Sequence, residues 1–113
     1  MSENDPMPSF TVAVRDSDDG ASTIEAAGEI DLASSPELRR VLQAVLDDGV
    51  RHLVLDFQGV TFIDSSGLGV LVGALKRLNE GGDDGVLEVR GMSAPVRKVF
   101  EITGLTEIFV ISD

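Results

Sequence analysis

The apolar residues of this chain change their spacing several times, and the order of those changes constrains the fold more than any other sequence feature. Phe10, Val12 and Val14 alternate with polar residues, which is the period-2 pattern of a half-buried strand. A turn containing glycine follows, and a second strand is predicted over residues 22–29, so the two strands form a hairpin. The uninterrupted apolar run over residues 53–55 is typical of a strand covered on both faces, and the chain continues from it in extended form.

Segments with helical spacing separate these strands. The first has two possible starts, because Ser34 with Glu37 fits a capping box, whereas Ser35 followed by Pro36 fits a cap with a proline in the first turn. Both starts stay open on the sequence, and Gly49 ends the helix. The residues expected to face the core are Leu38, Val41, Leu42, Val45 and Leu46 in this helix, and Val96, Val99, Phe100 and Thr103 in a later one.

The rest of the chain continues the alternation. A second helix is predicted over residues 65–79 and a third from the cap residue Ser93 to Gly104, with strands over residues 86–89 and 107–111. Strands that alternate with helices form parallel pairs joined by right-handed crossovers. We therefore predict an α/β fold with a mixed, mostly parallel sheet of about five strands and three helices. It forms one domain over residues 9–113, after a flexible lead of residues 1–8.

The charge balance narrows the classes of partner. Among 113 residues, 20 are acidic and 9 are basic, which gives a net charge of −11. Nucleic acid and anionic membranes both favour a basic surface, so neither is expected to bind. The absence of cysteine excludes disulfides and thiolate metal sites. The N-terminal residues lack the apolar core of a signal peptide, and no apolar run is long enough to span a bilayer. We expect a cytoplasmic protein without membrane insertion.

The segment Asp64-Ser65-Ser66-Gly67 lies where the third strand gives way to the second helix. Asp64 or Ser65 can accept hydrogen bonds from the free N–H groups of the helix start, so one of them is expected to be the N-cap. At 100° per residue, the side chains expected to face the core are Leu68, Leu71, Val72, Leu75 and Leu78. The opposite stripe, expected to face outward, consists of Ser66, Val70, Gly73 and Arg77.

Three glycines in one helix require an explanation, because glycine weakens a helix by roughly 1 kcal/mol relative to alanine. Gly67, Gly69 and Gly73 all fall within the first three turns of the predicted helix. Close approach of a partner explains them, and so does tight packing of the helix against the sheet. The sequence favours neither explanation.

Catalytic motifs are not found around this segment. It contains neither a phosphate-binding loop nor the G-x-S-x-G pattern of a hydrolase nucleophile. The only histidine, His52, begins the third strand, whereas Ser66 follows that strand's far end, so the two are not expected to meet. Paired aspartates fall in turns or at a helix end, where solvent surrounds them. We predict a protein that is not an enzyme, without cofactor or metal.

Residues 53–57 and 60–69, which include the hexapeptide D-S-S-G-L-G, closely resemble the signature of STAS domains of the anti-sigma factor antagonist type. The sequence G-E-I-D at residues 28–31 and the sequence V-F-E-I-T-G-L at residues 99–105 match other recognisable segments of that family. The resemblance extends over about residues 10–111.

The resemblance implies a bacterial partner-switching protein that regulates transcription. In that family, the unmodified antagonist binds an anti-sigma factor that is also a serine kinase, and a sigma factor is thereby freed. The kinase phosphorylates the serine before the first glycine of the motif, here Ser66, and a PP2C-type phosphatase reverses the step. Asp31 matches an aspartate needed for phosphorylation or partner contact. The residues expected to bind the partner are Asp31, Asp64, Ser65, Gly67, Gly69, Val70, Gly73 and Arg77.

One departure from the family concerns the C-terminus. Members usually continue past the last strand into a C-terminal helix, whereas this sequence ends at Asp113, so that helix is expected to be missing. An alternative function is a non-phosphorylated STAS subunit with a structural role in a lipid-transport or other membrane-associated assembly. Such a subunit has no need of the intact Ser65-Ser66-Gly67 motif, which argues mildly against it. A nucleotide-binding domain is disfavoured because no phosphate-binding loop is present.

Overall fold

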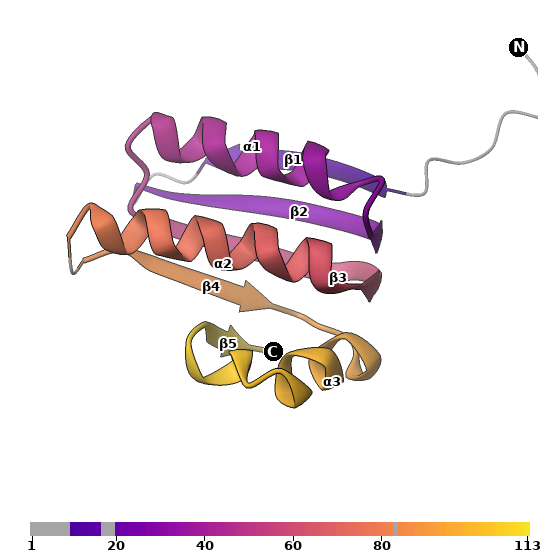
Figure 1. The fold of residues 1–113 in the computed structure, drawn as a ribbon. Coiled ribbons are helices and arrows are strands. Elements are labelled where there is room, and N and C mark those ends of the chain that lie inside the picture. The colour runs from indigo at the N-terminus through magenta and orange to yellow at the C-terminus, as the bar shows by residue number, and fades with distance from the viewer. Residues whose placement is uncertain (1–9, 17–19, 83) are drawn as a thin grey trace, which may run out of the picture.

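One five-stranded sheet runs through the chain, in which the computed structural model describes residues 10–16, 20–82 and 84–113 (Figure 1). The strands lie side by side in chain order. The first pair is antiparallel, and every later pair is parallel. The strands are β1 (Phe10–Asp16), β2 (Ala21–Ile30), β3 (His52–Ile63), β4 (Val86–Arg90) and β5 (Val110–Ser112). The predicted lead of residues 1–8 lies outside the described residues.

Three helices connect the parallel strands and lie on one face of the sheet (Figure 1). Successive parallel strands add to the sheet in one direction, so right-handed crossovers place every connecting helix on the same side. The helices are α1 (Ser35–Asp47), α2 (Ser65–Glu80) and α3 (Ala94–Ile102), and a 3-10 turn, η1 (Leu105–Glu107), precedes β5. The predicted α/β fold, with five strands and three helices, is confirmed.

The core lies between these helices and the face of the sheet that they cover. Alternate strand residues point into it, among them Leu53, Leu55 and Phe57 of β3, which have no exposed surface. Phe100 of α3 packs edge-on against Phe109, with ring centroids 5.9 Å apart. Full burial of one such side chain contributes about 1.5–3 kcal/mol, so this single apolar layer holds the three helices on the sheet.

The other face of the sheet carries mostly polar side chains and has no helix over it among the described residues. Glu25, Asp56 and Arg90 lie on this open face, in positions that alternate with core residues. Val54 also points to it, yet is only 4% exposed, because it is paired with Thr23 on one side and Glu88 on the other. The predicted strand over residues 53–55 is confirmed, but helices cover only one of its faces.

Three local predictions are wrong. Thr103 was expected in the core, but it is exposed at the end of α3, where its hydroxyl donates to the Val99 carbonyl at 2.8 Å. Val72 of α2 is 37% exposed rather than buried. The last strand begins at Val110 instead of residue 107, because η1 takes up the preceding residues. Within the described ranges, no helix has the length and apolar character needed to cross a bilayer.

Candidate functional site

The D-S-S-G segment lies at the edge of the sheet where the parallel strands β2 and β3 both end. Asp31 directly follows β2 and Asp64 directly follows β3, and the backbone N–H of Asp64 donates to the Ile30 carbonyl at 3.1 Å. This hydrogen bond holds the two strand ends next to each other. In open α/β sheets, ligands typically bind outside the carboxyl ends of the strands. The fold therefore brings together the two aspartates that the sequence placed 33 positions apart.

Asp64 is the N-cap of α2 and also holds the hydroxyl of Ser66. Its Oδ1 accepts from the backbone N–H of Ser66 at 2.9 Å and of Gly67 at 3.3 Å, and from the Ser66 hydroxyl at 2.5 Å. Of the two caps that the sequence allowed, Asp64 is confirmed. The hydrogen bond from the Ser66 side chain, followed by those from the backbone of Gly67 and Ser66, lowers the pKa of the Asp64 carboxyl. The carboxylate is thus ionised at neutral pH and acts as an acceptor.

The two serines differ in exposure and in hydrogen bonding. Ser65 is exposed, and its hydroxyl has no hydrogen bond to the described part of the chain. Ser66 is half-buried and donates to Asp64. Ser66 therefore has a fixed hydroxyl position at the start of α2, where the free N–H groups and the helix dipole favour an added negative charge by about 0.3–1 kcal/mol.

The loop from β2 to α1 is fixed by Asp31 and Ser34. The Asp31 carboxylate accepts from the backbone N–H groups of Ala33 and Ser34, both at 3.0 Å. The Ser34 hydroxyl accepts from the Asp31 N–H at 2.9 Å and donates to the Glu29 carbonyl at 2.7 Å. Asp31 is half-buried, and it follows Ile30, whose carbonyl accepts from the N–H of the α2 cap Asp64. These hydrogen bonds make Asp31 a fixed negative charge at the site.

At the start of α1 the structure shows neither of the two side-chain caps that the sequence left open. Ser34 is the residue before the helix, but its side chain bonds to the end of β2 instead of capping the helix. Glu37 does not complete a capping box, because its carboxylate pairs with Arg40 at 2.9 Å. Ser35 is the first helical residue and is buried. The Ser34 side chain therefore stabilises the loop that contains Asp31 and does not cap the helix.

The three glycines of α2 have two different explanations. A Cβ atom on Gly67 would lie 2.5 Å from Cγ2 of Ile30 and 2.9 Å from Cγ1 of Ile63, so Gly67 allows the helix to pack closely on the sheet. A Cβ atom on Gly69 or Gly73 would have no neighbour within 4 Å. Tight packing therefore accounts for Gly67, while Gly69 and Gly73 are exposed and leave the surface of α2 open.

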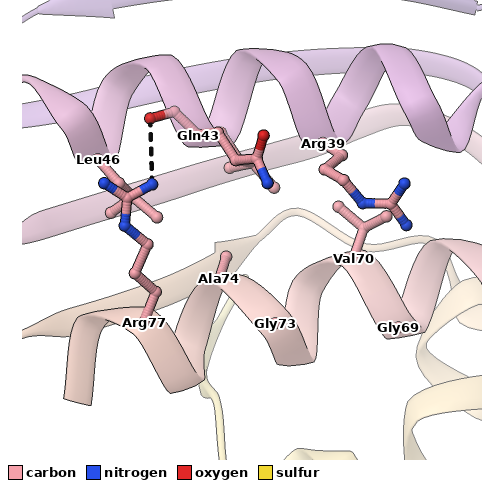
Figure 2. Close-up of a pocket in the computed structure, with 9 residues that line it drawn as sticks. Arg39, Gln43, Leu46, Gly69, Val70, Gly73, Ala74 and Arg77 are labelled. Atoms are coloured by element: carbon pink, nitrogen blue, oxygen red, sulfur yellow. Dashed lines mark hydrogen bonds between the residues drawn. The ribbon is translucent and has the colours of Figure 1, made fainter. Parts of the chain in front are cut away.

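The predicted outward stripe of Ser66, Val70, Gly73 and Arg77 is only partly exposed. Gly73 and Arg77 are exposed as predicted, but Val70 lies against α1, which is beside α2 on the sheet, and is only 4% exposed (Figure 2). A helical wheel assumes a single buried side, whereas α2 has two, one against the sheet and one against α1. Arg77 crosses to α1, where it pairs with Asp47 and donates to the Gln43 carbonyl.

A shallow groove of about 130 Å³ separates α1 from α2 above this stripe (Figure 2). Gly69 and Gly73 form its α2 side, and Arg39 and Gln43 form its α1 side. Sequence reasoning missed Arg39 and Gln43, although they are spaced four residues apart and so share one side of α1. The residues of α2 that lie opposite them could not be predicted, because the periodicity of each helix does not determine how two helices align along each other.

The remaining candidates for catalysis lie far apart. His52 begins β3 and Ser66 follows its other end, so about 35 Å of strand separates them. His52 instead lies near Glu88 on the open face, at 3.8 Å. Within the described ranges, no three histidine, aspartate or glutamate side chains are grouped so that they could hold a metal ion. The chemistry that this site offers is a serine hydroxyl held by the carboxylate of Asp64, at the strand ends where Asp31 also lies.

Comparison with known proteins gives consistent matches over most of the chain. A family model, the STAS domain, matches residues 13–113. The anti-sigma-B factor antagonist of Staphylococcus aureus is 37% identical over 90 residues, which are 80% of this chain and 82% of that protein. An anti-sigma factor antagonist from Mycobacterium paratuberculosis has a crystal structure with a TM-score of 0.84 at 32% identity, covering 92% of this chain and 86% of that one. The Bacillus cell fate determinant SpoIIAA in its phosphorylated form matches with a TM-score of 0.70 over 91% of this chain and 92% of that one. At 22% identity, that last likeness shows the fold alone.

Proposed function

Because the chain belongs to the STAS domain family, we propose that it is an anti-sigma factor antagonist whose binding is switched off by phosphorylation of Ser66. In this proposal the unmodified protein binds an anti-sigma factor that is also a serine kinase, and a sigma factor is released. A PP2C-type phosphatase restores the unmodified form. The exchange takes place in the bacterial cytoplasm, where a sigma factor acts.

The observation that carries the proposal is the placement of the Ser66 hydroxyl. It lies at the start of α2, half-buried, with its oxygen held by Asp64. In the transfer, a bond forms between the Ser66 Oγ and the γ-phosphorus of ATP, ADP leaves, and the hydroxyl proton passes to a base. The attacking oxygen belongs to a rigid element, which favours transfer to one defined atom.

The charge of the phosphate gives the switch its physical basis. Phosphorylation adds about −1.5 to −2 charge units beside the carboxylates of Asp64 and Asp31. Like charges about 6 Å apart near a protein surface repel enough to weaken a contact by roughly tenfold to a few hundredfold. A partner that approaches this edge would meet both the repulsion and the added bulk. The helix dipole at the start of α2 favours the phosphate by only about 0.3–1 kcal/mol. It therefore accommodates the added charge without cancelling the repulsion.

The partner surface that we propose consists of the exposed part of this edge and the groove beside it. Asp31, Asp64 and Ser65 lie at the edge, and Gly69, Gly73 and Arg77 lie along the groove. Gly67 and Val70 are buried, so in this conformation they support the surface from beneath. A surface without side chains at Gly69 and Gly73 lets a partner backbone approach α2 closely.

The first prediction tests the modification. Incubation with ATP and a kinase-like anti-sigma factor encoded near this protein is expected to add one phosphate, seen as a single step in intact mass. Ser66→Ala should take up none, while Ser65→Ala, the matched control next to it, should be labelled like the wild type. Phosphorylated protein should bind the kinase at least tenfold more weakly in a calorimetric titration.

Two results would contradict the proposal. Equal labelling of Ser66→Ala and the wild type would show that Ser66 is not the acceptor. If the wild type accepts no phosphate from any kinase of this kind, the non-phosphorylated structural role would replace the proposed switch.

A further inference from the structure

Arg39 is unusual among the arginines of this acidic chain. Six arginines form ion pairs with carboxylates, and they are Arg15, Arg40, Arg51, Arg77, Arg90 and Arg97. Arg39 is exposed and has no hydrogen bond or ion pair within the described part of the chain. A guanidinium remains charged at all relevant pH values, so Arg39 is a cation available to an anion near it.

The alignment of the two helices places Arg39 near the start of α2. α1 and α2 run side by side in the same direction (Figure 1), and the pairing of Asp47 with Arg77 puts residues 30 positions apart opposite each other. Arg39 is therefore level with Gly69, and both line the groove. The residue of α1 that is level with Ser66 lies three positions before Arg39, which is less than one helical turn.

The direction of the side chain shortens this remaining distance. Helical side chains lean toward the N-terminus and cover the turn before their own Cα atom. Figure 2 shows Arg39 reaching from α1 to Val70, which follows Ser66 by one turn on the same side of α2. An arginine that leans in this direction extends from Val70 toward the turn of α2 that begins at Ser66.

We infer that the Arg39 guanidinium binds the phosphate carried by Ser66 and holds it across the end of the groove between α1 and α2. This inference rests on the proposed phosphorylation of Ser66. A guanidinium can donate two parallel hydrogen bonds to one phosphate, which fixes the orientation of the group as well as its place. The ion pair would cover Gly69, one of the two open positions on the proposed partner surface.

The other charges near Ser66 direct the phosphate the same way. Asp64 lies at its side on α2, and Asp31 follows the neighbouring strand, so both repel the phosphate. On α1, Glu37 is engaged with Arg40. Arg77 lies at the far end of the groove and pairs with Asp47. Arg39 is thus the unpaired cation at the end of the groove where the phosphate would form.

The test measures the second pKa of the phosphate, which is about 6 for a phosphoserine without a partner. Phosphoserine is installed at position 66 by genetic code expansion, and the pKa is read from a phosphorus NMR titration. A neighbouring cation favours the dianion, so Arg39→Gln should raise this pKa by about 0.3–0.7 pH units, the size expected for an exposed ion pair. Arg40→Gln is the matched control. It removes the same charge one position along the helix, from an arginine that is already paired with Glu37.

A rise confined to Arg39→Gln supports the inference. No rise in that variant, or an equal rise in Arg40→Gln, would overturn it. Both residues are exposed, and circular dichroism verifies that each variant is folded. The outcome is separate from that of the proposed function, because the installed phosphoserine needs no kinase. A kinase that fails to label Ser66 would contradict the proposed function, whereas an unchanged phosphate pKa contradicts only the role of Arg39.

Discussion

Asp64 combines two tasks that depend on the same charge. Its carboxylate caps α2 and holds the Ser66 hydroxyl, and these hydrogen bonds lower its pKa in the folded protein. A carboxyl whose pKa is lower in the folded than in the unfolded state stabilises the fold at pH values above its unfolded-state pKa. That stabilisation is lost as the pH falls through its folded-state pKa. The charge that prepares Ser66 therefore also contributes to stability at neutral pH and loses this contribution in acid.

Replacing Asp64 tests this coupling. Asp64→Ala is expected to lower the Tm at pH 7 by roughly 2–6 °C, because the helix loses its cap. The difference in Tm between this variant and the wild type should shrink as the pH falls below 3.8, the ordinary pKa of aspartate. Thermal unfolding followed by circular dichroism between pH 7 and pH 2.5 gives the comparison. Asp64→Asn keeps an acceptor oxygen for the cap but loses the charge, so its Tm at pH 7 should lie between those of Asp64→Ala and the wild type. A gap between Ala and wild type that is the same at every pH would contradict the role of the charge.

At the scale of the element, α2 carries three glycines with different surroundings, and alanine substitutions should separate them. Gly69→Ala and Gly73→Ala are expected to raise the free energy of unfolding by about 0.5–1 kcal/mol, because alanine favours the helix and the added Cβ meets nothing. Gly67→Ala should lower it by about 1–3 kcal/mol, because its Cβ would overlap Ile30 and Ile63 in the core. Urea unfolding of the three variants measures this. A stabilised Gly67→Ala variant would show that the contact with the sheet is not tight.

The same helix shows how far sequence reasoning reaches. The helix itself, its start near Ser65 and a cap at either Asp64 or Ser65 follow from local patterns, and the structure confirms the helix and identifies Asp64 as the cap. The prediction that Val70 faces solvent is wrong, because the spacing of apolar residues identifies a buried side but not a second one against α1. Arg39 was missed for a related reason. Its importance depends on the alignment of α1 with α2, which the ion pair between Asp47 and Arg77 makes visible only in three dimensions.

For the whole molecule, the one-sided arrangement of helices gives β3 two unequal faces. Leu55 points into the core and has no exposed surface, whereas Val54 points to the open face and is shielded by its strand neighbours. Leu55→Ala should therefore lower the free energy of unfolding by about 2–5 kcal/mol. Val54→Ala should cost clearly less, about 0.5–1.5 kcal/mol, because water and neighbouring side chains can occupy the space. Denaturant unfolding compares the two, and equal losses would mean that the open face is packed like the core.

The overall architecture could be predicted because each strand and helix has its own periodicity and the crossovers have one hand. The extent to which the sheet is covered could not be predicted from the run over residues 53–55. Three consecutive apolar residues look alike whether the middle one meets a helix or the side chains of Thr23 and Glu88. The position of the D-S-S-G segment after the third strand followed from the order of the elements, whereas Asp31 was expected at the site from the family resemblance alone. The pairing of β2 with β3 supplies the geometric reason.

The uncovered face of the sheet also offers a way to watch the switch at work. Thr11 lies exposed on β1, and the sheet stands between this face and the helices that carry Ser66 and the groove. The chain contains no cysteine, so Thr11→Cys would supply a unique thiol for a fluorescent dye. A dye anchored there would report association with the kinase and release after phosphorylation, in real time, without touching the surface on which either event depends.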